Sequence, residues 1–333
     1  MKQTTLLNHL NRPTQGVPSY VKLEEAFYPQ NATVDSWFYT GNHKADGIYI
    51  SFLLHFIEMD SENGRVIKTC FSVTDHLTGE YVANDTVITA KDNIFTQDGQ
   101  LTIQSDTYKA VGNLNEIRLT GQFEQSSIDL VLKPQGAVIN NGGSGYYPIV
   151  MNIKENTHFS IPYMAMTGNI TLNGKSHAVS GNCWLDRQYQ DFTLGFTGGE
   201  PVHPGAWAWL GIAMEDGTAI SIWDYPIDGI NYTFASLVFA NGRQAVIEID
   251  SITKNAKEIW VSPQTGRRYP THWVVNIPEF DIALDINANP KGQEIVASYE
   301  TMHKYEGSSA VVGVIKGKAV EGHCMIELSG PWL

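Results

Sequence analysis

The sequence predicts an all-β protein with antiparallel sheets. Five Asn-Gly or Asp-Gly dipeptides stand between segments rich in β-branched and aromatic residues, as two-residue hairpin turns with positive φ require: Asn63-Gly64, Asp98-Gly99, Asn173-Gly174, Asp216-Gly217 and Asn241-Gly242. No segment between them sustains an apolar period of 3.6 residues, so helix is expected only as a minor component. The strand pattern stops at 134–145 and then resumes. This break predicts two β-barrel or sandwich domains in tandem.

The first domain is expected over residues 1–139, of which 1–16 are polar and predict a loosely held arm. The segment at 48–58 is apolar on both faces, as in a strand that separates two packed layers. We interpret His55, within it, as a hydrogen-bonded histidine of the barrel wall, because no other histidine or carboxylate lies two residues away. The strands of this domain are expected at 19–23, 35–41, 48–58, 66–75, 80–90, 101–104, 108–114, 117–123 and 128–133.

The glycine-rich segment 140–145 is predicted to be a linker, and the second domain is expected over 146–333. Its predicted strands lie at 149–153, 159–164, 166–172, 176–189, 233–239, 244–251, 257–261, 271–277, 280–286, 294–303, 308–316 and 319–328, with a hairpin at 206–225. Each half therefore has enough strands to close its sheet or nearly close it, which protects the edges.

Composition limits the possible partners and surroundings. The chain has 333 residues and a net charge of −13, which argues against a nucleic acid or an anionic membrane surface as partner. Three cysteines without C-x-x-C spacing indicate neither a disulfide framework nor a zinc site, and they favour a reducing cytoplasm. No apolar run of about 18 residues is present, so integral membrane association is not expected.

Motifs for cofactor chemistry are missing from the sequence. It has no glycine-rich phosphate loop, no H-E-x-x-H and no His-x-His pair, so we expect no cofactor and no metal. The segment Gly142-Gly143-Ser144-Gly145 is close to a serine-hydrolase elbow, which needs glycine two residues after the serine. Tyr146 occupies that position, and this disfavours a serine hydrolase.

The segment 181–190 carries the strongest candidate for chemistry. If it is extended, Trp184, Asp186 and Gln188 share one face, while Leu185, Arg187 and Tyr189 share the other. An aromatic ring, a carboxylate and an amide then point the same way. Asp186 is the candidate catalytic acid, although an ion pair between an aspartate and a neighbouring arginine is an equally good structural interpretation.

Further aromatic residues are predicted to line a substrate site together with Trp184 and Gln188. Trp207, Trp209 and Trp223 come from the adjoining hairpin, and Trp37 and Tyr39 are expected to contribute from the first domain. Such pockets are mostly apolar with a few placed polar groups. Tryptophans also serve as core fillers, so this pattern is open to a purely structural interpretation.

Six segments together resemble the AttH/CrtC-like family of tandem lipocalin-like proteins. They are Asp35-Ser36-Trp37-Phe38-Tyr39-Thr40-Gly41, Phe71-Ser72-Val73-Thr74-Asp75, Gly145-Tyr146-Tyr147, Gly181-Asn182-Cys183-Trp184-Leu185-Asp186-Arg187-Gln188, Trp207-Ala208-Trp209 and Glu327-Leu328-Ser329-Gly330. The resemblance implies two lipocalin-like β-barrels with a ligand pocket in or between them. The family includes carotenoid and prenyl-chain hydratases and Diels-Alderase cyclases of natural-product biosynthesis. In the hydratases a proposed proton donor lies in a Tyr-x-Asp motif, and Trp184-Leu185-Asp186 is the matching position.

Two functional hypotheses from different classes follow. The first is a cofactor-free enzyme that binds a long apolar polyene, prenyl or polyketide-like molecule and catalyses its hydration or its Diels-Alder-type cyclisation. Asp186 would supply the proton and the indoles would stabilise positive charge. The second is a lipocalin-like carrier that binds a hydrophobic small molecule without chemistry.

Overall fold

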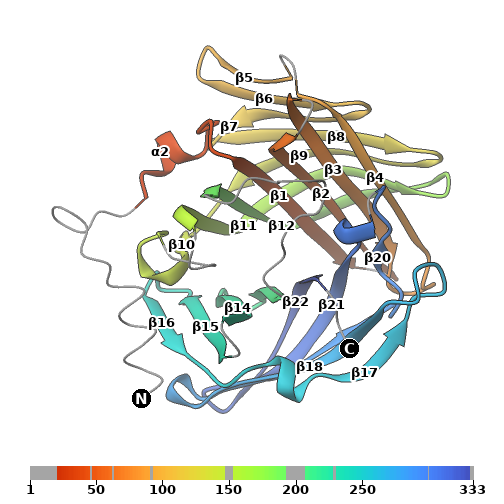
Figure 1. Ribbon diagram of the computed structural model, residues 1–333. Coiled ribbons are helices and arrows are strands. Elements are labelled where there is room, and N and C mark those ends of the chain that lie inside the picture. The colour runs from red at the N-terminus through yellow and green to blue at the C-terminus, as the bar shows by residue number, and fades with distance from the viewer. Residues whose placement is uncertain are drawn as a thin grey trace, which may run out of the picture.

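Two curled antiparallel sheets make up the protein (Figure 1). The computed structural model describes residues 21–45, 47–61, 64–90, 93–146, 153–192, 207–227, 230–298 and 300–330. The strand order of the first sheet is β4-β3-β2-β1-β12-β11-β9-β8-β7-β6-β5, with β10 paired to β11. The second sheet has the order β16-β15-β14-β13-β22-β21-β19-β18-β17, with β20 paired to β21. The predicted all-β class with two tandem antiparallel units is confirmed.

The two sheets share one topology. In each, the first and last strands along the chain pair with each other, as β1 with β12 and β13 with β22. Each strand order ends on strands that are adjacent in sequence, β4 and β5 in one sheet and β16 and β17 in the other. Among the described strands these ends do not pair, so each sheet is open at a point in the middle of its own sequence.

The elements of the first sheet begin after a short helix, α2. Their bounds are α2 Leu23–Ala26, β1 Val34–Ala45, β2 Ile48–Ser61, β3 Gly64–Asp75, β4 Tyr81–Thr89, β5 Ile94–Gln97, β6 Gln100–Ser105, β7 Tyr108–Asn113, β8 Glu116–Phe123, β9 Ser126–Pro134, β10 Ile139–Asn140, the 3-10 helix η1 Asn141–Gly143, β11 Ile153–Leu172 and β12 Lys175–Phe192. The turn between β11 and β12 uses Asn173-Gly174, and both residues have positive φ, as a two-residue hairpin demands.

The second sheet runs from β13 to β22. Its elements are β13 Trp207–Met214, β14 Ala219–Ile227, β15 Ile230–Val238, β16 Gln244–Glu248, η2 Thr253–Asn255, β17 Lys257–Val261, β18 Arg268–Ile277, η3 Pro278–Phe280, β19 Ile282–Ala288, β20 Glu294–Ile295, η4 Glu300–Met302, β21 Lys304–Ile315 and β22 Lys318–Ser329. Sequence reasoning placed a single strand over 294–303, whereas the structure has the short β20 followed by η4.

The sheets do not divide the chain at the predicted linker. Strands β11 and β12 follow the segment 140–145, yet they are central strands of the first sheet and pair with β9 and β1. The change of sheet falls between Phe192 and Trp207. The glycine-rich segment forms η1, where Asn141 is fully buried and donates a hydrogen bond to Ser160 Oγ at 3.0 Å. Glycine richness marks a tight turn here because Gly142 adopts positive φ.

The buried apolar residues of the described chain form three clusters, each in a separate layer. One fills the concave side of the first sheet, and a second fills that of the second sheet. The third lies between the two sheets, and we call it the inter-sheet layer. Its buried members are Phe38, Leu53, Cys70, Ile139, Trp184, Trp209, Ala219, Trp223, Tyr225, Phe234, Val238, Ile295 and Met325. Alternation along β1 and β12 sends odd and even positions to different layers.

Two buried histidines lie where the sheets meet, His76 against Ser308 of the second sheet and His323 against Tyr49 of the first, and they predict acid sensitivity. Ser308 Oγ of the second sheet lies 3.2 Å from His76 Nε2 and 2.9 Å from His323 Nε2. Burial lowers the pKa of His76 to about 4 and holds that of His323 well below its usual range. Because the unfolded chain takes up protons near pH 6.5 while folded His76 does not, stability is present above that pH and is lost as pH falls toward 4.

We therefore expect the free energy of unfolding to fall by about 3 kcal/mol through His76 alone between pH 6.5 and 4. His76→Gln removes the titrating group, so its stability should depend less on pH over this range. Urea unfolding at a series of pH values measures the slope, with His177→Gln at the partly exposed His177 as the control. Equal slopes for wild type and His76→Gln would contradict the assignment.

Candidate functional site

The predicted alternation along β12 is present, and it directs Trp184 and Asp186 into the inter-sheet layer. Asp186 pairs with Phe38 of β1, and antiparallel partners share a face, so Phe38 lies in the same layer. Trp184 and Asp186 are buried, with 4% and 6% of their surfaces exposed, whereas Gln188 on the same face is half-buried. The neighbouring Arg187 points to the other side of the sheet, as described below.

Asp186 is held by two nitrogen groups on one of its oxygens. Trp184 Nε1 donates a hydrogen bond to Asp186 Oδ1 at 2.7 Å, and His158 Nε2 of β11 lies 3.1 Å from the same oxygen. Within the described part of the chain, no hydrogen bond to Oδ2 is found. The carboxyl group thus has one anchored oxygen and one that remains available in the layer.

His158 is nearly fully buried, with 1% of its surface exposed, and it contacts both sheets. Trp223 Nε1 of the second sheet donates to His158 Nδ1 at 3.3 Å, and an indole nitrogen is only ever a donor. His158 Nδ1 therefore accepts a hydrogen bond from the second sheet, while Nε2 lies in contact with Asp186 of the first. Sequence reasoning missed His158, because no local spacing relates it to Asp186. The β11–β12 pairing brings them together, since it places His158 opposite Gln188, two residues from Asp186.

Indole rings from the second sheet close the layer around this pair. Trp209 contacts Phe38 edge-on with ring centroids 5.4 Å apart and lies 6.0 Å from the Trp184 ring. Its Nε1 donates to Ser221 Oγ at 3.1 Å, and this bond fixes the plane of the ring. Trp223 meets the imidazole of His158 edge-on at 5.7 Å, and Trp207 is half-buried and packs against the same cluster. Three of the predicted indoles, Trp184, Trp209 and Trp223, thus lie close to Asp186 or to its partner His158.

Gly211 leaves the space that the Trp209 ring occupies. A Cβ at this position would lie 2.4 Å from Trp209 Cη2 and 3.3 Å from Trp184 Cε2. Because neighbours hold the Trp209 ring on both sides, Gly211→Ala should lower the free energy of unfolding by about 1–3 kcal/mol. Urea unfolding followed by tryptophan fluorescence tests this, and unchanged stability would show that the ring is free to move.

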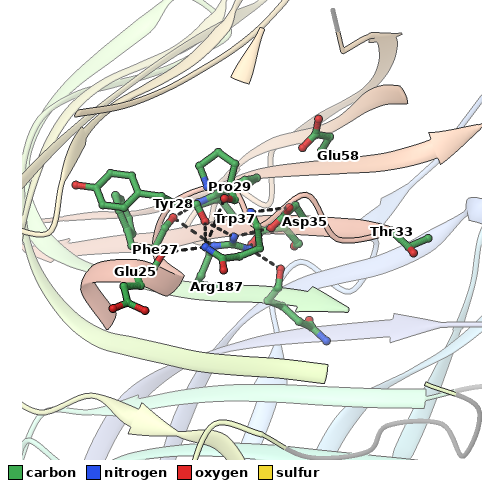
Figure 2. A network of polar contacts seen from close by, with 12 residues as sticks. Glu25, Phe27, Tyr28, Pro29, Thr33, Asp35, Trp37, Glu58 and Arg187 are labelled. Atoms are coloured by element: carbon green, nitrogen blue, oxygen red, sulfur yellow. Dashed lines mark hydrogen bonds and ion pairs between the residues drawn. The ribbon is translucent and has the colours of Figure 1, made fainter. Parts of the chain in front are cut away.

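Arg187 forms its ion pair with Asp35 and not with Asp186 (Figure 2). Its Nη2 lies 2.5 Å from Asp35 Oδ1, and both side chains are fully buried. The guanidinium also donates to backbone carbonyls of four residues: Phe27, Tyr28, Ser36 and Gln188. Of the two interpretations open at sequence level, an aspartate–arginine strut exists here, but Asp35 provides the carboxylate. Asp186 instead contacts Trp184 and His158.

Trp37 and Tyr39 lie in the core of the first sheet and do not face Asp186. They pair with Arg187 and Leu185, so alternation places both on the concave side. The guanidinium carbon of Arg187 stacks 4.1 Å from the Trp37 ring centroid, and Trp37 Nε1 donates to Phe27 O at 2.9 Å (Figure 2). The sequence analysis expected these two residues to share a site with Trp184. Which residues of β1 lie on the same face as Trp184 depends on the register of β1 against β12, and the sequence does not reveal this register.

Asp224, the other acid beside an indole, has a structural arrangement. Its carboxylate accepts hydrogen bonds from Thr233 Oγ1 at 2.9 Å, Ser251 Oγ at 2.8 Å and the Thr253 backbone N–H at 2.9 Å. A carboxylate with three donors is a stable acceptor, and it links β14 and β15 to η2. It gives a matched comparison for Asp186.

A second polar group lies in the space between the sheets, beyond Phe38. The Phe38 ring meets His55 edge-on at 4.8 Å. His55 Nε2 lies 2.7 Å from Ser36 Oγ, and its Nδ1 lies 3.1 Å from Lys304 Nζ of β21. Lys304 Nζ also contacts Glu327 Oε1 at 3.2 Å and Glu306 Oε1. His55 is hydrogen-bonded on both nitrogens. Its charged partner, Lys304, comes from the opposite sheet, over 240 residues away in sequence.

The described residues contain no metal-ligand cluster, no disulfide and no membrane-spanning helix. No three His, Cys, Asp or Glu side chains come together there as metal ligands would. The cysteines Cys70, Cys183 and Cys324 are all free and buried. No described helix has the length and apolar character needed to cross a membrane.

Comparison with known proteins identifies the family of this chain. Residues 20–331 match the AttH-like family. The chain belongs to this family. Curated relatives include the dehydratase asqC of Emericella nidulans, 24% identical over 227 residues, and the kievitone hydratase of Fusarium solani subsp. phaseoli, 24% identical over 257 residues. These matches cover 65% and 75% of this chain. They cover 62% of the dehydratase, less than two thirds of its length, and 67% of the hydratase.

Two solved structures show the same fold. A crystal structure assigned to AttH from Nitrosomonas europaea superposes with a TM-score of 0.78 at 20% identity, covering 95% of this chain and 99% of that one. The kievitone hydratase of Nectria haematococca gives a TM-score of 0.77 at 19% identity, covering 94% of each chain. The sequence resemblance is therefore confirmed at the level of family and fold.

Proposed function

We propose that this AttH-like protein is a lyase that adds water to, or removes it from, an isolated carbon–carbon double bond of an apolar small molecule. The observation that carries the proposal is Asp186: a buried carboxyl group, anchored through Oδ1, whose Oδ2 carries no hydrogen bond in the described part of the chain. Aromatic rings from both sheets surround it. Such a group is suited to transfer one proton in a site from which water is largely excluded.

Asp186 would act as the general acid through Oδ2. Protonation of an alkene carbon forms a new C–H bond with the π electrons and leaves a carbocation on the adjacent carbon. The remaining carboxylate is stabilised at Oδ1 by the N–H of Trp184 and by His158 Nε2. The faces of Trp184 and Trp209 stabilise the cation, because their π electrons attract positive charge.

Water completes the reaction in either direction. In hydration, water attacks the carbocation and releases a proton, which returns the carboxylate to its acid form. In dehydration, the acid protonates a hydroxyl group, the C–O bond breaks to release water, and the carboxylate takes a proton from the adjacent carbon. One carboxyl group that alternates between its two forms therefore balances protons in both directions.

The two curated relatives support this class of reaction, and the chemistry of Asp186 favours it over ring closure or simple carriage. The named relatives are a dehydratase and a hydratase, which are the two directions of one reaction. A carrier has no need for a buried acid with one oxygen left unbonded. A templating cyclase has no need for it either, because shape alone provides its effective molarity.

The test is a product assay in isotopically labelled water. The protein is incubated with alkenes that carry prenyl chains and with the corresponding tertiary alcohols, and products are measured by mass spectrometry. Hydration should add one labelled oxygen to the alkene, and dehydration should remove water from the alcohol. A product isomeric with the substrate would instead identify a cyclase, and quenching of tryptophan fluorescence without turnover would identify a carrier.

A further inference from the structure

Glu306 is a buried carboxyl group that the proposed mechanism does not use. It lies on β21, is fully buried, and contacts the Lys304 ammonium through Oε1. Its Oε2 has no hydrogen-bond partner among the residues that the structure describes. A buried polar atom without a partner is costly, and native proteins keep one mainly where a ligand, an ion or water completes it.

Strand register places Glu306 in line with the indoles of the site. Antiparallel partners share a face, and across the second sheet they form one row: Trp223, Trp209, Glu327 and Glu306. On the first sheet, Asp186, Phe38 and His55 form the facing row. Neighbouring strands lie about 4.8 Å apart, so His55 and Asp186 are on the order of 10 Å apart. Lys304, which contacts both His55 and Glu306, joins the ends of the rows.

We propose that Glu306, oriented by Lys304, is a substrate-binding group that donates a hydrogen bond from Oε2 to an oxygen of the substrate. This inference rests on the proposed function, because it names the substrate class for the same inter-sheet site. The substrate is an elongated apolar molecule with a carbonyl oxygen at one end. Its reacting double bond lies on the order of 10 Å away, beside Asp186.

The location of the proton follows from the contact with Lys304. The ammonium of Lys304 contacts Oε1, so Oε1 is an acceptor and a proton on Glu306 is carried by Oε2. Burial raises the pKa of Glu306 to about 8, although Lys304 opposes the change. At neutral pH the group is therefore a neutral donor, which matches a carbonyl oxygen better than a cation or a hydrocarbon.

Two uncharged titratable groups lie near Glu306, Cys70 on β3 and Tyr81 on β4, and burial raises the pKa of the Cys70 thiol to about 11 and that of Tyr81 well above its usual range. The charged neighbours of Glu306 come from four strands. Lys304 lies on its own strand, Glu327 on β22, His55 on β2 and Lys68 on β3, where Lys68 is paired with Asp85 of β4. Burial, with Lys304 and Lys68, holds the pKa of His55 well below its usual range. Glu306 and Glu327 overcome the effect of burial and hold the pKa of Lys304 well above its usual range. The charge of Glu306 is thus the one that we expect to change near pH 8.

The experiment compares two ligands by quenching of tryptophan fluorescence. The probes are geranylacetone, with a ketone at one end and a double bond at the other, and the hydrocarbon in which a methylene group replaces the ketone oxygen. At pH 6.5 the full-length protein should bind the ketone roughly tenfold more tightly than the hydrocarbon. The preference should disappear as pH rises through about 8, because ionised Glu306 no longer donates.

Glu306→Gln is the decisive variant, because its amide keeps an acceptor for Lys304 and a donor for the ketone. It should retain the roughly tenfold preference and lose the dependence on pH. Equal affinity of the wild type for both probes at pH 6.5, or the same pH dependence in Glu306→Gln, would overturn the inference. Ketone preference without gain or loss of water would refute the proposed lyase alone, and turnover without ketone preference would refute only the role of Glu306.

Discussion

Asp186→Asn should lower turnover by about two to four powers of ten while the protein remains folded and binds its ligand. The substituted amide still offers an oxygen to Trp184 Nε1, which donates to Oδ1 at 2.7 Å in the wild type. It cannot, however, release a proton from the position of Oδ2. Under the proposed mechanism the C–H bond then has no proton source, so kcat should fall far more than KM changes.

Asp224→Asn is the matched comparison, since Asp224 is also a buried aspartate next to an indole. Its carboxylate accepts three hydrogen bonds, and an amide cannot accept all of them with the same strength. We expect it to lower the free energy of unfolding by about 1–3 kcal/mol and to leave turnover of the remaining folded protein near wild type. Turnover and thermal unfolding measured on both variants separate the roles. Full turnover in Asp186→Asn would exclude Asp186 as the acid.

Local features of the sequence predicted the fold well, because antiparallel strands and their hairpin turns have short sequence patterns. The Asn173-Gly174 turn and the period of two along β12 are properties of a few adjacent residues. The point at which the chain passes from one sheet to the other is not such a local property. Strand β12 belongs to the first sheet because it pairs with β1, about 150 residues earlier, and the glycine-rich segment 140–145 gives no information on that pairing.

The candidate site shows the same limit. Sequence alternation was sufficient to group Trp184 with Asp186 and to place Arg187 on the other face. His158 was missed because its relation to Asp186 depends on the register of β11 against β12. Glu306 reaches the layer through pairing in a different sheet. One glutamate among the 35 acidic residues of the chain carries no local mark of burial.

Arg187→Met should be the most destabilising of the changes considered, at about 3–5 kcal/mol. Removal of the guanidinium leaves Asp35 as a fully buried charge with a single remaining hydrogen bond, from the Gln30 backbone N–H at 3.1 Å. The carbonyls that Arg187 satisfies, including those of Phe27 and Tyr28, also lose their donor (Figure 2). Urea unfolding measures the loss, and the midpoint should fall without a change of slope.

Two further variants identify the cause. Asp35→Leu combined with Arg187→Met removes both charges, and it should recover much of the stability because the uncompensated carboxylate is gone. Arg118→Met breaks the exposed pair of Arg118 with Asp129, whose side chains are 62% and 54% exposed, and should change stability by less than about 1 kcal/mol. If Arg187→Met costs no more than Arg118→Met, the buried pair does not hold α2 and β1 against β12. A large loss that persists in the double variant would instead show that the carbonyl hydrogen bonds dominate.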